Sequence, residues 1–482
     1  MAQTITKKEL NRKTVVAGFF FVFMQLLVRG VTFLITPFYT RLVSVSQYGE
    51  IRVYESWLLI IVPVLSLSLY RSVERAKYDF EEDFEKFVAS VQTLSYLLTI
   101  CCFMLISIFM RNAFMDFCGM DGLMYIFAIM YTVAHTGVNF FQRREKQLLR
   151  YKSSVTLTAC MMLPAIILSV FLLYWGNISG RQNDLVDLRI IGYFTPQIIG
   201  GVLVAFIMWR QGGFKINTRY WKYAVVFSLP LIPETLSIQI MNQSDKIMVQ
   251  KMVSSECAGI FTLATTVSFI IWIIENAVWD AWLPWLYEKI SRSEIKDIQK
   301  PWDYIVYIFG FISWALVILA PEIILILGDA KYKEAAYLVA PMVTGTLFRF
   351  FSNSFTAVEN YQKKTLYSAA GTIAAMLVNV LLNLIFIRYV GYQAAAYTTA
   401  FSYFILLVLQ GIIEKRICGM RCVSMSRLVM LAILFFVLNV ATMGLYRVDT
   451  HLRWIVFMAV SALAVWKLWP STKTLLEQFK KG

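Results

Sequence analysis

The string RLVSVSQYG at residues 41–49 returns in similar form as KMVSSECAG at residues 251–259, 210 positions later (251 − 41). In both places the string ends one long apolar run and precedes another, and its Ser, Gln or Glu and Gly residues are typical of a short polar turn. A fixed internal period indicates a repeated architecture. We therefore predict two copies of one unit, each with a turn between two membrane-length helices, an arrangement that favours a transporter.

The composition indicates an integral membrane protein. Of the 482 residues, 59% are hydrophobic and only 16% are charged, and the mean hydropathy is +0.63, which is not the balance of a soluble domain. The apolar run at 15–39 is too long for a signal peptide and lacks a small-residue cleavage site, so we expect it to be the first spanning helix. The seven scattered cysteines predict neither a disulfide framework nor a metal site.

Apolar segments of about 20 residues, the length that crosses a bilayer, occur fourteen times. They lie near 15–39, 53–70, 88–110, 121–141, 154–175, 189–209, 223–245, 258–283, 304–327, 336–358, 366–388, 393–413, 427–446 and 452–469. The predicted fold is all-α and membrane-integral, with two six-helix repeats. Residues 1–210 form an N-terminal lobe, 211–420 a C-terminal lobe, and 421–482 two additional helices and a tail.

The distribution of basic residues supports this helix count. When the N-terminus is taken as cytoplasmic, 31 of the 45 Lys and Arg residues fall in cytoplasmic tails and loops, 12 in the opposite loops, and two inside helices. Positive charge is enriched on the cytoplasmic side of membrane proteins, so both termini are predicted to be cytoplasmic. Six helices per copy is an even number, so the repeat should be parallel, about an axis along the membrane normal.

Three passages resemble Wzx-type polysaccharide (O-antigen) flippases of the multidrug, oligosaccharidyl-lipid and polysaccharide exporter superfamily. They are YTRLVSVSQYGEI with SLSLYRSVERAKYDF within 39–80, SLPLIPETLSIQIMNQSDKIMVQKMVSSECAGIFTL at 228–263, and NVLLNLIFIRYVGYQAAAYTTAFSYF at 379–404. The resemblance implies two lobes around a central cavity. It also implies alternating-access movement of an undecaprenyl-diphosphate-linked oligosaccharide from the cytoplasmic to the outer leaflet of a bacterial inner membrane, with H⁺ or Na⁺ as the coupling ion.

Four arginines are candidates for binding the anionic pyrophosphate of such a substrate. Arg29 and Arg349 lie deep in apolar segments, where an unpaired Arg costs about 2.5–3.5 kcal/mol, so each should face either a cavity or a structural ion pair. Arg71 and Arg75, in YRSVER, match a basic position of the family, although side chains near an interface also snorkel to water. The planar guanidinium suits phosphate because it donates two parallel hydrogen bonds.

The acidic residues of the apolar segments concentrate in the seventh segment (223–245) and the eighth (258–283). They are candidates for ion coupling. These residues are Glu234, Asp245, Glu275 and Asp280. A carboxyl group at this depth can be neutral when desolvated and ionise when a cavity opens. The alternatives are an ion pair of Glu234 with a deep arginine, a structural role for Asp245, and interfacial positions for the other two.

Two prolines in LPLIPE make the seventh segment a candidate hinge. Pro230 and Pro233 each remove a backbone donor, so the helix should bend where they lie. The neighbouring Glu234 would then sit at the moving part of the chain.

Two other classes compete with the flippase. A multidrug antiporter of the same superfamily would carry cations, which the deep arginines disfavour. A membrane enzyme of polysaccharide assembly, such as a polymerase, would need a large loop or a catalytic motif, and no nucleophile, metal cluster or phosphate loop is apparent in the sequence. We expect no cofactor and no nucleic acid, with membrane lipids and polymerase or glycosyltransferase proteins as partners.

Overall fold

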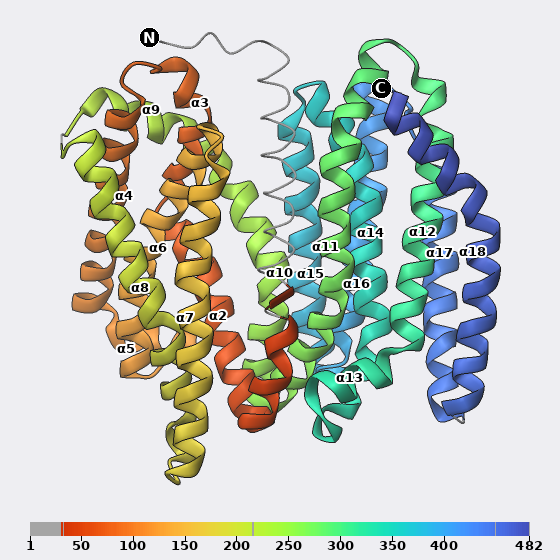
Figure 1. Cartoon of the computed structure of the whole chain (residues 1–482), viewed down its shortest axis with the longest axis horizontal. Coiled ribbons are helices and arrows are strands. Elements are labelled where there is room, and N and C mark those ends of the chain that lie inside the picture. Colours follow the sequence, from red (N-terminus) through yellow and green to blue (C-terminus); the bar gives the residue numbers. More distant parts are fainter. Residues whose placement is uncertain (1–29, 32, 215, 449, 482) are drawn as a thin grey trace. The chain divides into compact units, whose positions relative to one another are not determined.

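The computed structural model describes residues 30–31, 33–214, 216–448 and 450–481, and every regular element within these ranges is helical (Figure 1). The long helices are α2 (Val45–Leu65), α4 (Phe84–Phe109), α6 (Gly122–Gln147), α7 (Tyr151–Ile178), α8 (Leu185–Gly212), α10 (Ile232–Met252), α11 (Ser255–Ser291), α12 (Gln299–Ile318), α14 (Ala336–Tyr361), α15 (Thr365–Val390), α16 (Ala394–Ile413), α17 (Met425–Met443) and α18 (Thr450–Lys481). The short ones are α3 (Val73–Asp79), α5 (Arg111–Cys118), α9 (Thr218–Ser228) and α13 (Ala320–Gly328). The predicted all-α membrane class is confirmed.

Within the described residues, eleven helices are long and apolar enough to cross a membrane, or twelve if one bent pair counts as a single span. Most of the first predicted span, 15–39, falls outside those residues. The total of fourteen spans and the internal repeat therefore stay predictions.

The repeated string begins a helix in both of its copies. Ser44 accepts from the backbone N–H of Gln47 (3.1 Å), whose side chain accepts from the N–H of Ser44 (3.0 Å), which is a complete capping box at α2. Ser254 accepts from the N–H of Cys257 (3.1 Å) at the start of α11. The serine is therefore the element of the string that starts the next helix, whereas the glycine of each copy lies inside that helix.

The chain forms two compact units, Met1–Gln243 and Ser244–Gly482. In the first, α8 packs closely against α6, where a Cβ at Gly201 would lie 2.5 Å from the carbonyl oxygen of Ala134. Any larger side chain at 201 would push these two helices apart.

In the second unit, α14 is the central buried helix and packs against α11, α12, α16 and α17 (Figure 1). The two C-terminal helices, α17 and α18, are attached to the rest of the second unit by polar contacts. Asn439 of α17 donates to Ser313 Oγ (2.7 Å) and to Thr344 Oγ1 (2.9 Å), and Arg453 of α18 pairs with Glu322 of α13.

Candidate functional site

The second predicted span is broken in the first unit. Beyond α2 the chain passes through Leu67 and Ser68, whose φ angles of 49° and 48° are unusual for residues other than glycine. It continues as a 3₁₀ turn, η1 (Leu69–Ser72), and α3, bent by 59° from α2. The carbonyl of Ser66, at the break, accepts from the N–H of Leu69 (3.3 Å) and from Ser95 Oγ (3.0 Å). Strained backbone of this kind gathers at functional sites, and broken spans commonly line substrate paths in transporters.

The predicted hinge sequence forms a second break. A 3₁₀ turn, η3 (Leu229–Leu231), separates α9 from α10, with Pro230 inside the turn and Pro233 at the start of α10. Thr235 Oγ1 donates to the carbonyl of Leu231 (2.9 Å). Because α9 packs against η1, the two breaks lie next to each other within the first unit.

Arg71 connects these breaks. It lies in η1, and its Nη1 is 2.5 Å from Thr235 Oγ1, to which it donates. No carboxylate of the described chain forms an ion pair with Arg71, and the side chain of Glu234, next to Thr235, has no hydrogen bond to a described residue. Arg75, by contrast, pairs with Asp79 (3.3 Å) and its side chain is 68% exposed. Of these two arginines, Arg71 has the guanidinium whose charge is available to an anion.

A buried carboxylate with only neutral hydrogen-bond partners lies in the second unit. Asp245, near the end of α10, is 5% exposed. Asn383 Nδ2 of α15 donates to its Oδ1 (2.6 Å), and Thr399 Oγ1 of α16 donates to its Oδ2 (2.5 Å). No Lys, Arg or His of the described residues lies within ion-pair distance of this carboxylate, although Lys246 is its neighbour in the chain. The arrangement leaves a negative charge in an apolar unit without a bonded cation, which is costly.

Oxygen atoms are concentrated around Asp245. Asn379 donates to Thr399 Oγ1 (3.2 Å) and accepts from Asn383 (3.5 Å), while Thr398 donates to Asn383 Oδ1. Thr399 Oγ1 also lies 2.7 Å from the carbonyl oxygen of Ala395, yet a hydroxyl has one hydrogen to donate. Carboxylate, amide, hydroxyl and carbonyl oxygens together form the ligand set of a hard cation, and a proton on Asp245 would supply the missing donor.

Arg349 and Glu275, two of the predicted site residues, form an ion pair. Arg349 Nη2 of α14 lies 2.7 Å from Glu275 Oε2 of α11, and Asn353 Nδ2 donates to Glu275 Oε1 (2.6 Å). The Arg349 guanidinium also faces the ring of Trp272 at 5.9 Å. Of the two alternatives for Arg349 given by the sequence, the structure shows the ion pair.

The other predicted residues are dispersed. Asp280 is exposed on α11, and Arg29 lies outside the described residues. Sequence reasoning missed Thr399 and Asn353, which complete the two carboxylate sites. The signal for them was present as polar residues within apolar runs, TT in AAAYTTAF and SNS in FRFFSNSF.

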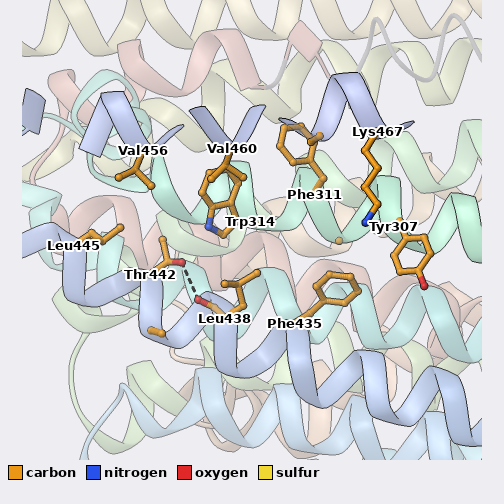
Figure 2. A pocket seen from close by; sticks show the side chains of 13 residues that line it. Tyr307, Phe311, Trp314, Phe435, Leu438, Thr442, Leu445, Val456, Val460 and Lys467 are labelled. Carbon is orange, nitrogen blue, oxygen red and sulfur yellow. Dashed lines mark hydrogen bonds between the residues drawn. The ribbon is translucent and has the colours of Figure 1, made fainter. Parts of the chain in front are cut away.

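An apolar groove of about 770 Å³ lies between α12, α17 and α18 (Figure 2). Its lining consists of Tyr307, Gly310, Phe311, Trp314, Phe435, Leu438, Ala441, Thr442, Leu445, Val456, Val460, Ala464 and Lys467. The Thr442 hydroxyl is used within its own helix, donating to the Leu438 carbonyl (2.8 Å). Lys467 and Tyr307 lie at one end (Figure 2), so the groove combines hydrocarbon walls with a cation at that end.

Comparisons with known proteins agree with this architecture. The family model described as "Polysaccharide biosynthesis protein" matches residues 15–290. The chain is 22% identical over 327 residues to "Lsg locus putative protein 1" of Haemophilus influenzae, covering 66% of this chain and 77% of that protein.

Two solved structures are similar in fold. One is the "Lipid II flippase MurJ, inward closed conformation", with a TM-score of 0.62, 14% identity, and coverage of 96% of this chain and 99% of that one. The other is an inward-facing multidrug resistance MATE family transporter of the MOP superfamily, with a TM-score of 0.52, 14% identity, and coverage of 84% and 92%. The fold is therefore that of the flippases and transporters of this superfamily, in agreement with the resemblance seen in the sequence.

Proposed function

Because this multi-pass membrane protein belongs to the polysaccharide biosynthesis protein family, we propose that it is a flippase that moves a lipid-linked oligosaccharide across a bacterial cytoplasmic membrane and couples this movement to H⁺ or Na⁺. The cargo is an undecaprenyl-diphosphate-linked saccharide, carried from the cytoplasmic to the outer leaflet, with both termini cytoplasmic. Support for the lipid cargo comes from the similarity in fold to a lipid II flippase.

The observation that carries the coupling proposal is the environment of Asp245. This carboxylate is buried, and its hydrogen-bond partners Asn383 and Thr399 are neutral. Binding a monovalent cation or a proton removes the cost of the isolated charge, so the ion and the packed state of α10, α15 and α16 stabilise each other. One charge crossing 100 mV supplies about 2.3 kcal/mol, whereas a shift from 1:99 to 99:1 needs about 5.5 kcal/mol. Binding of the cargo must supply the remainder.

Each unit, taken by itself, contains a feature that suits one chemical part of the cargo. The unpaired charge of Arg71, beside the paired breaks of the first unit, suits a diphosphate. The groove between α12, α17 and α18 has the apolar lining that a hydrocarbon chain requires. Glu234, Pro230 and Pro233 then belong to the break that moves, and Arg29 is a further candidate contact to the diphosphate.

Transport in liposomes tests the coupling. Wild-type protein, reconstituted with a fluorescent lipid-linked oligosaccharide, should respond either to an imposed Na⁺ gradient or to an imposed pH gradient, which identifies the ion. Asp245→Asn should retain slow equilibration of the lipid but lose its response to the gradient, because the amide cannot take up the ion. Glu256→Gln, an exposed carboxylate on α11, is the matched control and should respond like wild type. An unchanged gradient response in Asp245→Asn would place the coupling elsewhere.

Replacement of Arg71 tests the anion contact. Arg71→Ala should lower transport at least tenfold, which corresponds to about 1.4 kcal/mol, and Arg71→Lys should restore it only in part because Lys lacks the two-pronged geometry. Arg75→Ala is the control, since that side chain is exposed and paired with Asp79. Equal losses in Arg71→Ala and Arg75→Ala would contradict a specific contact.

A further inference from the structure

Two glutamates that no part of the transport proposal uses are buried at the ends of α14 and α16. Glu359 lies in the last turn of α14 and is 0% exposed. Glu414 follows α16 directly, at the start of a π-helical turn, η6 (Glu414–Cys418), and is 2% exposed. η6 packs against α14, so the two glutamates lie on neighbouring elements. Both carboxyl groups also lie at helix C-termini, where the backbone dipole disfavours negative charge.

The polar atoms around this pair are mostly acceptors, with the Ser368 hydroxyl as a donor beside Glu359. Among the described residues, no side chain or backbone group lies in hydrogen-bond geometry with either buried carboxyl oxygen of Glu359. Gln410 Oε1 on α16 is also buried and unpartnered, although its Nε2 donates to the carbonyl of Ser368 (3.1 Å), a residue whose side chain faces Glu359. Glu414 accepts a single weak bond, from the N–H of Cys422 (3.3 Å). A buried acceptor without a donor costs about 1–3 kcal/mol. When both glutamates are ionised, this cluster therefore lacks hydrogen-bond donors.

No basic side chain of the described chain compensates the two carboxylates. The elements around the pair carry several titratable groups, which are Tyr361, Lys363, Lys364, Lys415, Arg416, Cys418, Arg421, Cys422, Asp303 and Arg427. Lys415, Arg416 and Arg421 are exposed, Lys364 donates to the carbonyl of Ile417, and Arg427 pairs with Asp303. Among the described residues, none of these cations forms an ion pair with Glu359 or Glu414. Two uncompensated charges this deeply buried are not sustainable in a packed unit.

We propose that Glu359 and Glu414 form a proton-binding site that closes the ends of α14 and α16. When these ends are packed, each carboxyl group holds a proton, and the two O–H groups supply donors that the cluster lacks. When the ends separate and water enters, the protons pass to water and the two carboxylates repel each other. The site lies on the side that the charge distribution predicts to be cytoplasmic, and it does not depend on the identity of the cargo or on the role of Asp245.

Infrared spectroscopy of the full chain in lipid nanodiscs tests the proposal directly. A protonated carboxylic acid has a carbonyl band separate from that of a carboxylate. At neutral pH the wild type should show this band, and Glu359→Gln and Glu414→Gln should each lose part of it. Glu256→Gln, which changes an exposed carboxylate, should leave the band unchanged.

Thermal unfolding gives a second measurement on the same samples. The folded state binds these protons more tightly than the unfolded state. The free energy of unfolding should therefore fall as the pH rises through the range in which the two carboxyl groups lose their protons. The double replacement Glu359→Gln with Glu414→Gln should flatten this dependence, since neutral amides need no proton. Persistence of the acid band and of the pH slope in both glutamine variants would overturn the proposal. Strong stabilisation of the wild type by Mg²⁺ or Ca²⁺ that the double variant lacks would also overturn it, in favour of a bound divalent cation.

Discussion

Glu275 and Asp245 are both buried acids of the second unit, with exposed fractions of 3% and 5%, yet their surroundings differ. Glu275 forms an ion pair with the Arg349 guanidinium and accepts a hydrogen bond from the Asn353 amide. Asp245 accepts hydrogen bonds only from the Asn383 amide and the Thr399 hydroxyl among the described residues. The first carboxylate has its charge compensated by a guanidinium, whereas the second has only neutral hydrogen-bond partners among the described residues. Burial alone therefore does not show whether an acid is charge-compensated, and the charge of its neighbours does.

The largest expected effect comes from Glu275→Gln, which leaves the Arg349 side chain, 19% exposed, without its anion. Removal of one partner of a buried ion pair costs about 3–5 kcal/mol, and we expect the free energy of unfolding to fall by this amount. The measurement is unfolding in mixed micelles, followed by tryptophan fluorescence. The double replacement Glu275→Gln with Arg349→Gln should recover most of the loss, and a double variant no more stable than Glu275→Gln would contradict the pairing.

An intermediate effect is expected for Thr399→Val, which removes one of the two donors to Asp245. A hydrogen bond to a charged group is worth about 1.5–3 kcal/mol, so the free energy of unfolding should fall within that range when the ion is absent. Added coupling ion should reduce the loss, because an ion-bound or protonated Asp245 needs fewer donors. Thr265→Val, whose hydroxyl donates only along its own helix to Phe261, is the control. Equal costs at the two threonines would show that Asp245 is not charged in the folded protein.

The smallest expected effect is that of Asp245→Asn on stability. The new amide can donate to Thr399 Oγ1 while that hydroxyl donates to the Ala395 carbonyl, 2.7 Å away. The existing donors and acceptors then keep their partners, and since a neutral hydrogen bond is worth about 0.5–1.5 kcal/mol, the change should be about 1 kcal/mol or less. The same unfolding assay checks it. A loss as large as that of Glu275→Gln would mean that a cation of the protein compensates Asp245 after all.

Much of the candidate site could be named from the sequence but not assembled from it. Arg349 and Glu275 were both singled out by the cost of charge in an apolar segment, and their pairing remained one of two alternatives. Their separation of 74 residues (349 − 275) means that only the packing of α14 on α11 brings them together. The neutral surroundings of Asp245 could not be read from the sequence, because its partners Asn383 and Thr399 lie 138 and 154 residues further along the chain.

The LPLIPE break shows the opposite case. Proline removes backbone donors wherever it stands, so local chemistry alone predicted an interruption, and a 3₁₀ turn is found there. Before the break after α2 the sequence carries Pro63, but nothing local predicts the positive φ angles of Leu67 and Ser68. That conformation is sustained by tertiary contacts such as the bond from Ser95 to the Ser66 carbonyl.

By itself the sequence determined that this is an all-helical membrane protein, that a polar turn separates two helices at the repeated string, and which side chains are costly in an apolar setting. These properties follow from hydrophobic length, local hydrogen bonding and charge, which act over a few residues. Only the tertiary structure decided which acid is neutralised by the protein and which is left with neutral partners. That outcome depends on side chains carried by helices distant in the chain, and electrostatic compensation requires contact within a few ångströms.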